Sequence, residues 1–250
     1  MKDWYEIRNA ASPKAEVWIY EDIGENWWGE GLTAKKFVSE LNAITAGEID
    51  LHVNSYGGSV FDGHTIYNAL VRHPANVTTY IDGVAASIAS VVALAGDTII
   101  MPANAMLMIH DPLGMCCGGA EEMRSYADVL EKVRDTILNV YAEHSTKTRD
   151  ELSAAMTAET WMTADDAVEY GFISEVAQPL KMAAHSPSQI VARFKNAPAV
   201  LYGKLPPEPN TPAASAENAV ETVAETVPPE RDWVPVSSCG RLVAFPPRSK

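Results

Sequence analysis

The arrangement expected for this chain follows from residues 80–96, which are Tyr80-Ile-Asp-Gly-Val-Ala-Ala-Ser87-Ile-Ala-Ser-Val-Val-Ala-Leu-Ala-Gly96. A β-branched run precedes and enters this stretch and favours a strand, which Gly83 is expected to break. From Ala85 onward small and apolar residues follow without a charge, which predicts a buried helix closed by Gly96 in the left-handed conformation. We therefore expect a strand, a sharp turn and a buried helix.

Ser87 falls in the first turn of this predicted helix. The backbone N–H groups there lack intrahelical partners, and the helix dipole favours negative charge. A serine hydroxyl at this place can attack a carbonyl carbon while the N–H of Ile88 helps to hold the oxyanion. The alternative is a small serine that only allows close packing, since serine is common at helix starts.

The composition is that of a soluble globular chain with one large domain or two small ones. Its 250 residues carry a formal net charge of −14, which argues against nucleic acid as the main partner because phosphate binding needs a basic face. The three cysteines, two of them adjacent, indicate a reducing compartment rather than a disulfide framework.

Neither a metal site nor a membrane segment is expected. No spacing of Cys and His residues fits a zinc site, and the first residues, Met1-Lys-Asp-Trp-Tyr-Glu, lack the apolar run of a signal peptide. The longest apolar stretch, Val84–Gly96, is shorter than the ~20 residues that span a bilayer. These features predict a cytoplasmic protein without a membrane partner.

Strand and helix patterns alternate along residues 16–110, which predicts βαβ-type units and a largely parallel sheet. A long amphipathic helix is expected over 120–145, with its apolar side buried in its own chain or facing another subunit. Further along, we expect a loop over 157–162 and a helix that Thr163 caps and Gly171 ends. From 178 to 250 the Pro- and Ala-rich composition predicts a largely disordered tail.

Two further features lie beside predicted strand ends. Gly57 and Gly58 follow the strand 49–53, and a Gly-Gly pair at such a turn lets main-chain N–H groups approach a ligand; a tight turn without a ligand is the alternative. His110 follows the strand 105–109, at the edge where open α/β folds place their chemistry. A lone histidine there is often structural, but with Ser87 it forms a candidate base and nucleophile pair.

These motifs together resemble the Clp-type (ClpP-like) serine peptidases. The resemblance rests on Asn54-Ser-Tyr-Gly-Gly-Ser-Val60, on Gly83-Val-Ala-Ala-Ser87-Ile88, on Met108-Ile-His110-Asp-Pro-Leu-Gly114 and on Ala167-Val-Glu-Tyr-Gly171. It covers residues 16–177, so that a peptidase domain is expected over 1–177 and the tail over 178–250. The opening Trp-Tyr-Glu-Ile and the Phe61-Asp-Gly63 segment are more similar to the bacteriophage and prophage branch associated with head maturation.

The resemblance implies a role for each motif residue. Ser87 would be the nucleophile and His110 its base, and the N–H groups of Ile88 and of the Gly57–Gly58 segment would form the oxyanion hole. The third triad member falls on Glu159, where aspartate is common in the family. Tyr56 also departs from the family pattern, since it stands where proline is usual. Asp165 and Asp166 are alternatives to Glu159, whereas Asp111 is expected to point away from His110.

The resemblance also implies the architecture and the partners. The expected fold is an α/β, ClpP/crotonase-like spiral of ββα units with a projecting helical handle over 120–145. The chain would assemble into homo-oligomeric rings, as a heptamer or a stacked double ring, and would cleave protein substrates such as phage scaffold or capsid proteins. This serine chemistry needs no cofactor and no metal, and an ATP-driven unfoldase is not expected.

Two other functions remain open from the sequence. A crotonase-type acyl-CoA enzyme has a related fold and also uses paired N–H groups on a thioester oxyanion, although the Ser87 and His110 pair argues against it. A scaffold or assembly protein with a degenerate peptidase domain is the non-enzymatic alternative.

Overall fold

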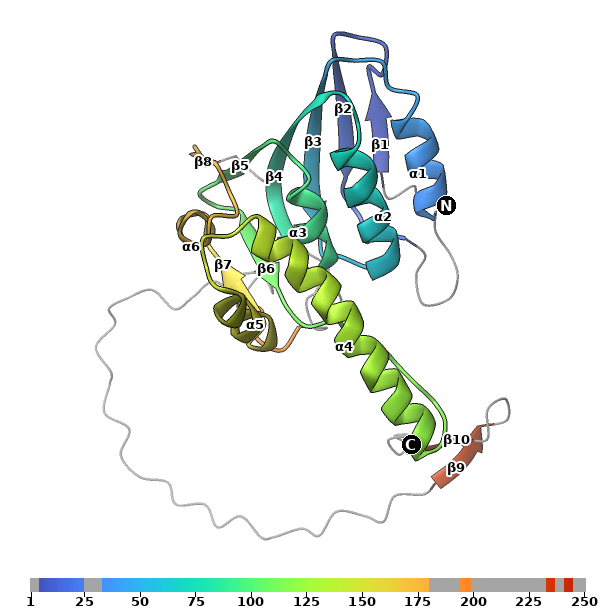
Figure 1. The fold of residues 1–250 in the computed structure, drawn as a ribbon. Helices are drawn as coiled ribbons and strands as arrows, with labels where there is room; N and C mark the ends of the chain where they lie inside the picture. Colours follow the sequence, from blue (N-terminus) through green and yellow to red (C-terminus); the bar gives the residue numbers. More distant parts are fainter. Residues whose placement is uncertain (1–4, 25–32, 180–193, 199–232, 237–240, 245–250) are drawn as a thin grey trace, which may run out of the picture. The chain divides into compact units, whose positions relative to one another are not determined.

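The computed structural model describes residues 5–24, 33–179, 194–198, 233–236 and 241–244 (Figure 1). Their contacts divide the chain into two compact units, residues 1–113 with 130–205 and residues 114–129 with 206–250. The first unit contains an eight-stranded sheet. The second contains a two-stranded antiparallel sheet of β9 (Trp233–Val236) and β10 (Arg241–Ala244). The composition of the tail did not predict this strand pairing.

The main sheet runs in the order β1-β2-β3-β4-β5-β8, with β6 paired to β4 and β7 paired to β6. The pairings of β2 through β5, of β4 with β6 and of β5 with β8 are parallel, which confirms the largely parallel sheet. The strands are β1 (Tyr5–Arg8), β2 (Lys14–Ile19), β3 (Glu48–Ser55), β4 (Asn76–Ala86), β5 (Thr98–Pro102), β6 (Met106–Ile109), β7 (Thr160–Met162) and β8 (Glu175–Ala177).

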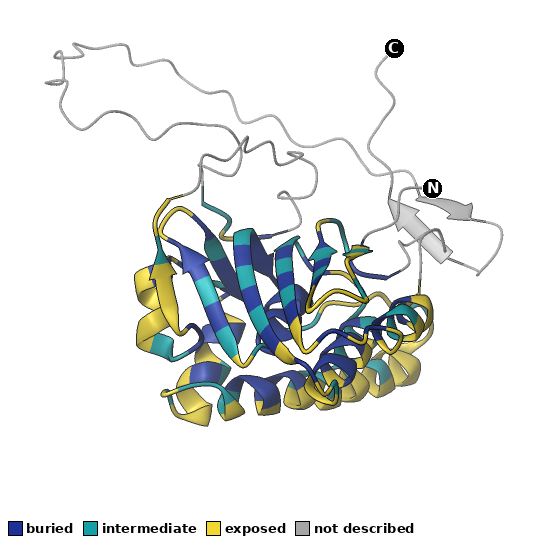
Figure 2. Ribbon diagram, turned by 90° about the horizontal axis from the view of Figure 1, so that it is seen from above, coloured by how far each residue is buried: buried dark blue, intermediate teal, exposed yellow. Residues whose placement is uncertain are grey.

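Three helices of the first unit cover one face of this sheet. Figure 1 shows α1 (Ala34–Leu41), α2 (Val60–Val71) and α3 (Ile88–Ala93) side by side on that face, and Figure 2 shows buried residues between this layer and the strands. Alternate residues of β3 are buried, because side chains of a strand point to opposite faces in turn. The remaining helices are α4 (Ala120–Glu143), α5 (Arg149–Thr157) and α6 (Ala164–Tyr170).

The opposite face of the sheet carries a row of stacked rings. Trp18, His52 and Tyr80 are register partners on β2, β3 and β4, with ring centroids 3.9 Å and 5.0 Å apart. Asp82 accepts a hydrogen bond from the Tyr20 hydroxyl at 2.6 Å and lies 2.8 Å from Nδ1 of His52. Such cross-strand pairs stabilise the register of the three strands.

Three local predictions were wrong around the serine segment. β4 passes through Gly83 and ends at Ala86, so the strand is longer than expected and α3 starts only at Ile88. Ser87 is therefore the residue before the helix rather than a member of its first turn. Gly96 is not among the described glycines with positive φ, whereas Gly171 ends α6 with φ of 82° as expected.

Two strands of the main sheet were missed by the prediction from the sequence. Residues 160–162, expected in a loop, form β7 against β6, and Tyr5–Arg8 pairs antiparallel with β2. In α4 the buried residues, Ile137, Leu138, Val140 and Tyr141, all belong to its second half, while Met123 and Val129 are exposed. Burial of the apolar side within the chain is thus limited to the end of this helix.

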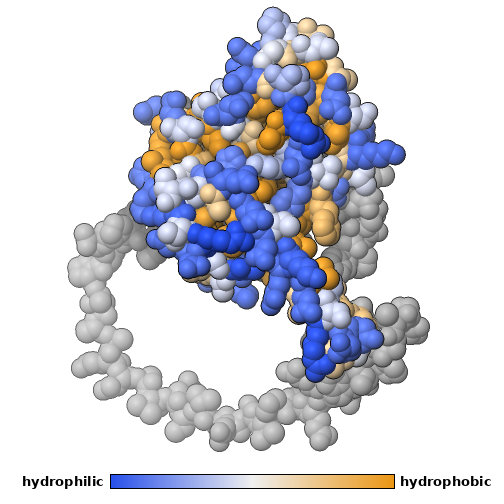
Figure 3. All heavy atoms as spheres, viewed as in Figure 1, coloured by the Kyte–Doolittle hydropathy of each residue, from blue (hydrophilic) through white to orange (hydrophobic). Residues whose placement is uncertain are grey.

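The surface mixes residue classes, and the view in Figure 3 shows hydrophilic and hydrophobic residues interspersed. Within the described ranges, none of the helices combines the length and the apolar character needed to cross a membrane. Most of the predicted tail lies outside the described residues, and the domain boundary at 177 stays a prediction.

We expect Gly96→Ala to destabilise the protein by about 1–3 kcal/mol, because a Cβ there would lie 2.5 Å from Oγ1 of Thr79. Adding Thr79→Ala should recover part of this loss, with a coupling energy of about 0.5 kcal/mol or more in a double-mutant cycle. The free energies of unfolding of the wild type, the two single variants and the double variant are measured by urea denaturation. Strictly additive effects would show instead that the cost comes from another neighbour of the added Cβ, such as the carbonyl oxygen of Thr98 at 3.0 Å.

Candidate active site

Ser87 sits at the junction of β4 and α3 in a strained backbone conformation. Its φ of 57° is rare for a residue with a side chain, and such strain persists only where neighbouring contacts hold it. The Ser87 N–H donates to the carbonyl of Met108 at 3.0 Å, and the hydroxyl of Ser90 donates to the carbonyl of Ser87 at 2.6 Å. These bonds hold Ser87 in the sharp turn between the end of β4 and the start of α3.

His110 faces this serine from the neighbouring strand. Residues 84–86 of β4 pair in parallel with residues 106–108 of β6, so the carboxyl ends of the two strands lie at the same edge of the sheet. His110 comes directly after β6, and its Nε2 lies 2.7 Å from Oγ of Ser87. For Nε2 to accept the serine proton, the neutral ring must carry its own proton on Nδ1.

Burial of the His110 side chain favours the neutral form of its imidazole. Loss of hydration lowers the pKa of His110, and the negative charges of Glu159 and Asp111 offset part of that effect. A neutral imidazole is the form that can accept a proton. The environment therefore favours a general base.

The turn that contains Gly57 and Gly58 packs closely against Ser87. Gly57 has a φ of 102°, and a Cβ on it would lie 2.7 Å from Cβ of Ser87; a Cβ on Gly58 would lie 2.2 Å from the carbonyl oxygen of Ile23. The N–H of Gly57 donates to Oγ of Ser55 at 3.2 Å. Among described residues, the N–H groups of Gly58 and Ile88 have no hydrogen-bond partner, which leaves them available for an oxyanion.

Glu159 is brought to the site by the pairing of β7 with β6. The register joins Ile109 to Thr160, and continuing it by one residue places Glu159 opposite His110. Glu159 is buried, with a φ of 53°. No hydrogen bond joins its carboxylate to His110 among the described residues. Its oxygens accept hydrogen bonds from other donors, one of which is Nε1 of Trp161 at 3.3 Å.

The alternative carboxylates are engaged elsewhere. Asp111 accepts from Nε of Arg134 at 2.5 Å and from the Thr157 hydroxyl at 3.0 Å, so it points away from the imidazole as expected. Asp166 accepts from the N–H and hydroxyl of Thr163 in a capping box, and Asp165 is exposed in the first turn of α6. Of the carboxylates considered, only Glu159 combines burial with a place opposite His110.

A cavity of about 260 Å³ opens beside the serine and the histidine. Its lining includes Gly58, Ile88, Tyr141 and Phe194 in addition to Ser87 and His110. Phe194 is not among the predicted site residues, because it lies in the predicted disordered tail and belongs to no local motif. Its aromatic character is the only local signal that could have singled it out.

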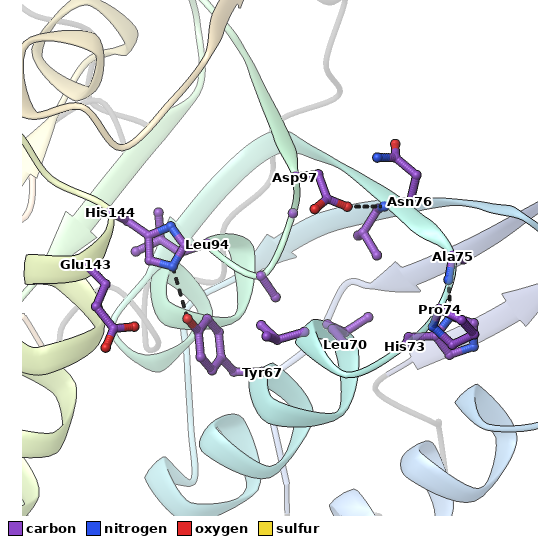
Figure 4. A pocket seen from close by; sticks show the side chains of 14 residues that line it. Tyr67, Leu70, His73, Pro74, Ala75, Asn76, Leu94, Asp97, Glu143 and His144 are labelled. Atoms are coloured by element: carbon purple, nitrogen blue, oxygen red, sulfur yellow. Dashed lines mark hydrogen bonds between the residues drawn. The ribbon is translucent and has the colours of Figure 1, made fainter.

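A larger cavity, of about 620 Å³, shares no lining residue with this one. It lies where α2, α3 and α4 end, and Figure 4 shows the Tyr67 hydroxyl directed at Nε2 of His144, 3.0 Å away. We assign the chemistry to the smaller cavity because it contains the nucleophile and base candidates. In the described part of the chain, no cluster of three or more His, Cys, Asp or Glu residues could hold a metal ion.

Comparison with known proteins gives a consistent family. Residues 2–179 match the family model described as Clp protease. The ATP-dependent Clp protease proteolytic subunit of Bacteroides fragilis is 35% identical over 140 residues, which cover 54% of this chain and 67% of that protein. The corresponding subunit of Streptococcus pneumoniae is 37% identical over 134 residues, covering 52% and 68%.

A solved structure agrees at the level of the fold. A ClpP1 mutant from Listeria monocytogenes superposes with a TM-score of 0.57 and 23% identity, covering 65% of this chain and 91% of that chain. The curated relatives are thus matched over about two thirds of their own length.

The pKa of His110 gives a pH test of the site. Because burial lowers it, the neutral imidazole persists below the ordinary histidine value of 6.5, and labelling of Ser87 by a fluorophosphonate should decline only through a midpoint below that pH. Glu159→Gln removes a charge that raises this pKa, so the midpoint should move further toward acid. Asp165→Asn is the matched control and should leave the midpoint in place.

Labelling is followed by intact mass over a pH series. A midpoint above 6.5, or equal shifts in the two variants, would contradict the assignment of His110 and of Glu159 as its charged neighbour.

Proposed function

Because this chain belongs to the Clp protease family, we propose that it is a serine endopeptidase that cleaves protein substrates through an acyl-enzyme. The observation that carries the proposal is the 2.7 Å contact between Oγ of Ser87 and Nε2 of His110. This contact lies at the carboxyl ends of two paired parallel strands, and it joins a hydroxyl to a base whose pKa is lowered.

The proposed acylation step uses three groups of the site. Oγ of Ser87 attacks the scissile carbonyl carbon while its proton passes to Nε2 of His110. Negative charge then develops on the carbonyl oxygen, where the N–H groups of Gly58 and Ile88 can donate to it. The tetrahedral intermediate collapses, the C–N bond breaks, and His110 returns the proton to the departing amine.

Deacylation repeats the sequence with water. His110 removes a proton from the water molecule, the hydroxide attacks the ester of Ser87, and the proton returns to Oγ as the ester bond breaks. Glu159 is proposed as the third member, which stabilises the imidazolium that forms in each step. Its charge already raises the His110 pKa from its place opposite the ring, which supports that role.

Substrate would enter beside the glycine turn. An extended peptide can add as a strand to main chain that keeps free hydrogen-bonding groups, and the N–H of Gly58, which has no partner among the described residues, provides one such group at the cavity. The chemistry proposed requires no cofactor and no metal.

The finer assignments are also proposals. Similarity of the opening Trp-Tyr-Glu-Ile and of Phe61-Asp-Gly63 to the phage branch supports an ATP-independent role in head maturation, with scaffold or capsid proteins as substrates in a host cytoplasm. Assembly into homo-oligomeric rings is supported by the family and by the exposed apolar residues Met123 and Val129 in the first half of α4.

Replacement of the nucleophile tests the proposed reaction. Ser87→Ala should abolish fluorophosphonate labelling and lower the hydrolysis rate of a casein substrate by about 10³-fold or more. Ser39→Ala, an exposed serine on α1, is the matched control and should behave as the wild type. Both rates are measured on full-length protein.

The rivals predict other results. A crotonase-type enzyme would leave Ser87 unlabelled and would hydrolyse or isomerise an acyl-CoA instead. A non-catalytic scaffold would show no labelling and no difference between Ser87→Ala and the wild type in any hydrolytic assay.

A further inference from the structure

Residues 194–198, outside the family match at 2–179, pack onto the candidate active site. The Phe194 ring is buried and meets the rings of His110 and Trp161 edge-on, with centroids 5.7 Å and 5.5 Å away, and lies 6.3 Å from the Tyr56 ring. It closes a small apolar cluster with Val84, Ala86 and Met108. Phe194 therefore covers the imidazole and lines the cavity that contains Ser87.

The same segment occupies the carboxylate of Glu159. The N–H of Lys195 donates to Oε2 at 2.8 Å, and the N–H of Asn196 donates to Oε1 at 2.6 Å. The side-chain amide of Asn196 also donates to the carbonyl of Ala158 at 2.8 Å. Hydrogen bonds to a carboxylate are stronger than those between neutral groups, so the docked segment competes directly with His110 for Glu159.

Tyr56 links the segment to the oxyanion turn. It stands directly before Gly57, at the position where proline is usual in the family, and its ring belongs to the apolar group around Phe194. One short segment thus contacts the base, the carboxylate opposite it and the residue before the glycine turn.

We propose that residues 194–198 are an intramolecular inhibitor that docks on His110 and Glu159 and must leave before a peptide substrate can bind. The proposal rests on the proposed serine peptidase function. In the docked state the Phe194 ring takes the apolar surface beside the base, and Glu159 cannot orient the imidazole. Activity then depends on the fraction of molecules in which the segment is released.

The test uses two full-length variants that weaken different contacts. Lys195→Pro removes the N–H that donates to Glu159 and constrains Phe194, and Phe194→Ala removes the ring that covers His110. Each should accelerate fluorophosphonate labelling of Ser87 by about tenfold or more, since labelling reports the released fraction. Lys195→Ala keeps the N–H and changes only an exposed side chain, so its rate should stay within about twofold of the wild type.

The outcomes separate this proposal from the proposed function. Equal labelling of the wild type, Lys195→Pro and Phe194→Ala overturns the inhibitory role and leaves the peptidase assignment standing. Slower labelling of Lys195→Pro beside normal Lys195→Ala also overturns it, because the segment would then support Glu159. Absence of labelling in all four folded proteins, checked by circular dichroism, overturns the serine peptidase itself.

Discussion

The hydrogen bond from the N–H of Ser87 to the carbonyl of Met108 is the contact on which the site depends. It extends the parallel pairing of β4 and β6 by one step beyond Ala86 and holds the serine in its positive-φ conformation. His110 follows Met108 by two residues, so the same pairing sets the place of both groups. A shift of this register would slide the end of β6 along β4. His110 would then move away from Ser87.

A small number of buried and partly buried ionisable groups determines the electrostatics at this edge of the sheet. The imidazole is buried and loses hydration, which lowers its pKa, while the nearby carboxylates of Glu159 and Asp111 act in the opposite direction. Asp111 is neutralised in part by Arg134 at 2.5 Å. The charge of Glu159 is instead met by two main-chain N–H groups and an indole. Glu159 therefore accepts main-chain hydrogen bonds from Lys195 and Asn196 while its charge raises the pKa of His110.

Prediction from the sequence worked for the parallel strands and the motif residues, and it failed at two glycines and at the strands β1 and β7. Alternation and small-residue patterns predicted the parallel strands. The motifs singled out Ser87, His110 and Gly58, and in the structure these three residues line one cavity. Gly83 did not end its strand, but the pairing of β4 with β3 shifts register between Ile81 and Ala85, and the neighbour on the other side changes there from β5 to β6. Gly96 serves close approach to Thr79 rather than a left-handed cap.

By itself, the sequence determined the residue types and the order of the elements: a serine before a small-residue helix, a histidine after a buried strand, and a glycine pair after another. These features depend on neighbours along the chain, which hydrophobic period and turn chemistry encode. Only the tertiary structure decided that β7 pairs with β6, that Glu159 comes opposite His110, and that Phe194 packs on the ring. Such contacts join residues far apart in sequence, and they depend on the shape and hydrogen-bonding groups that the folded sheet presents.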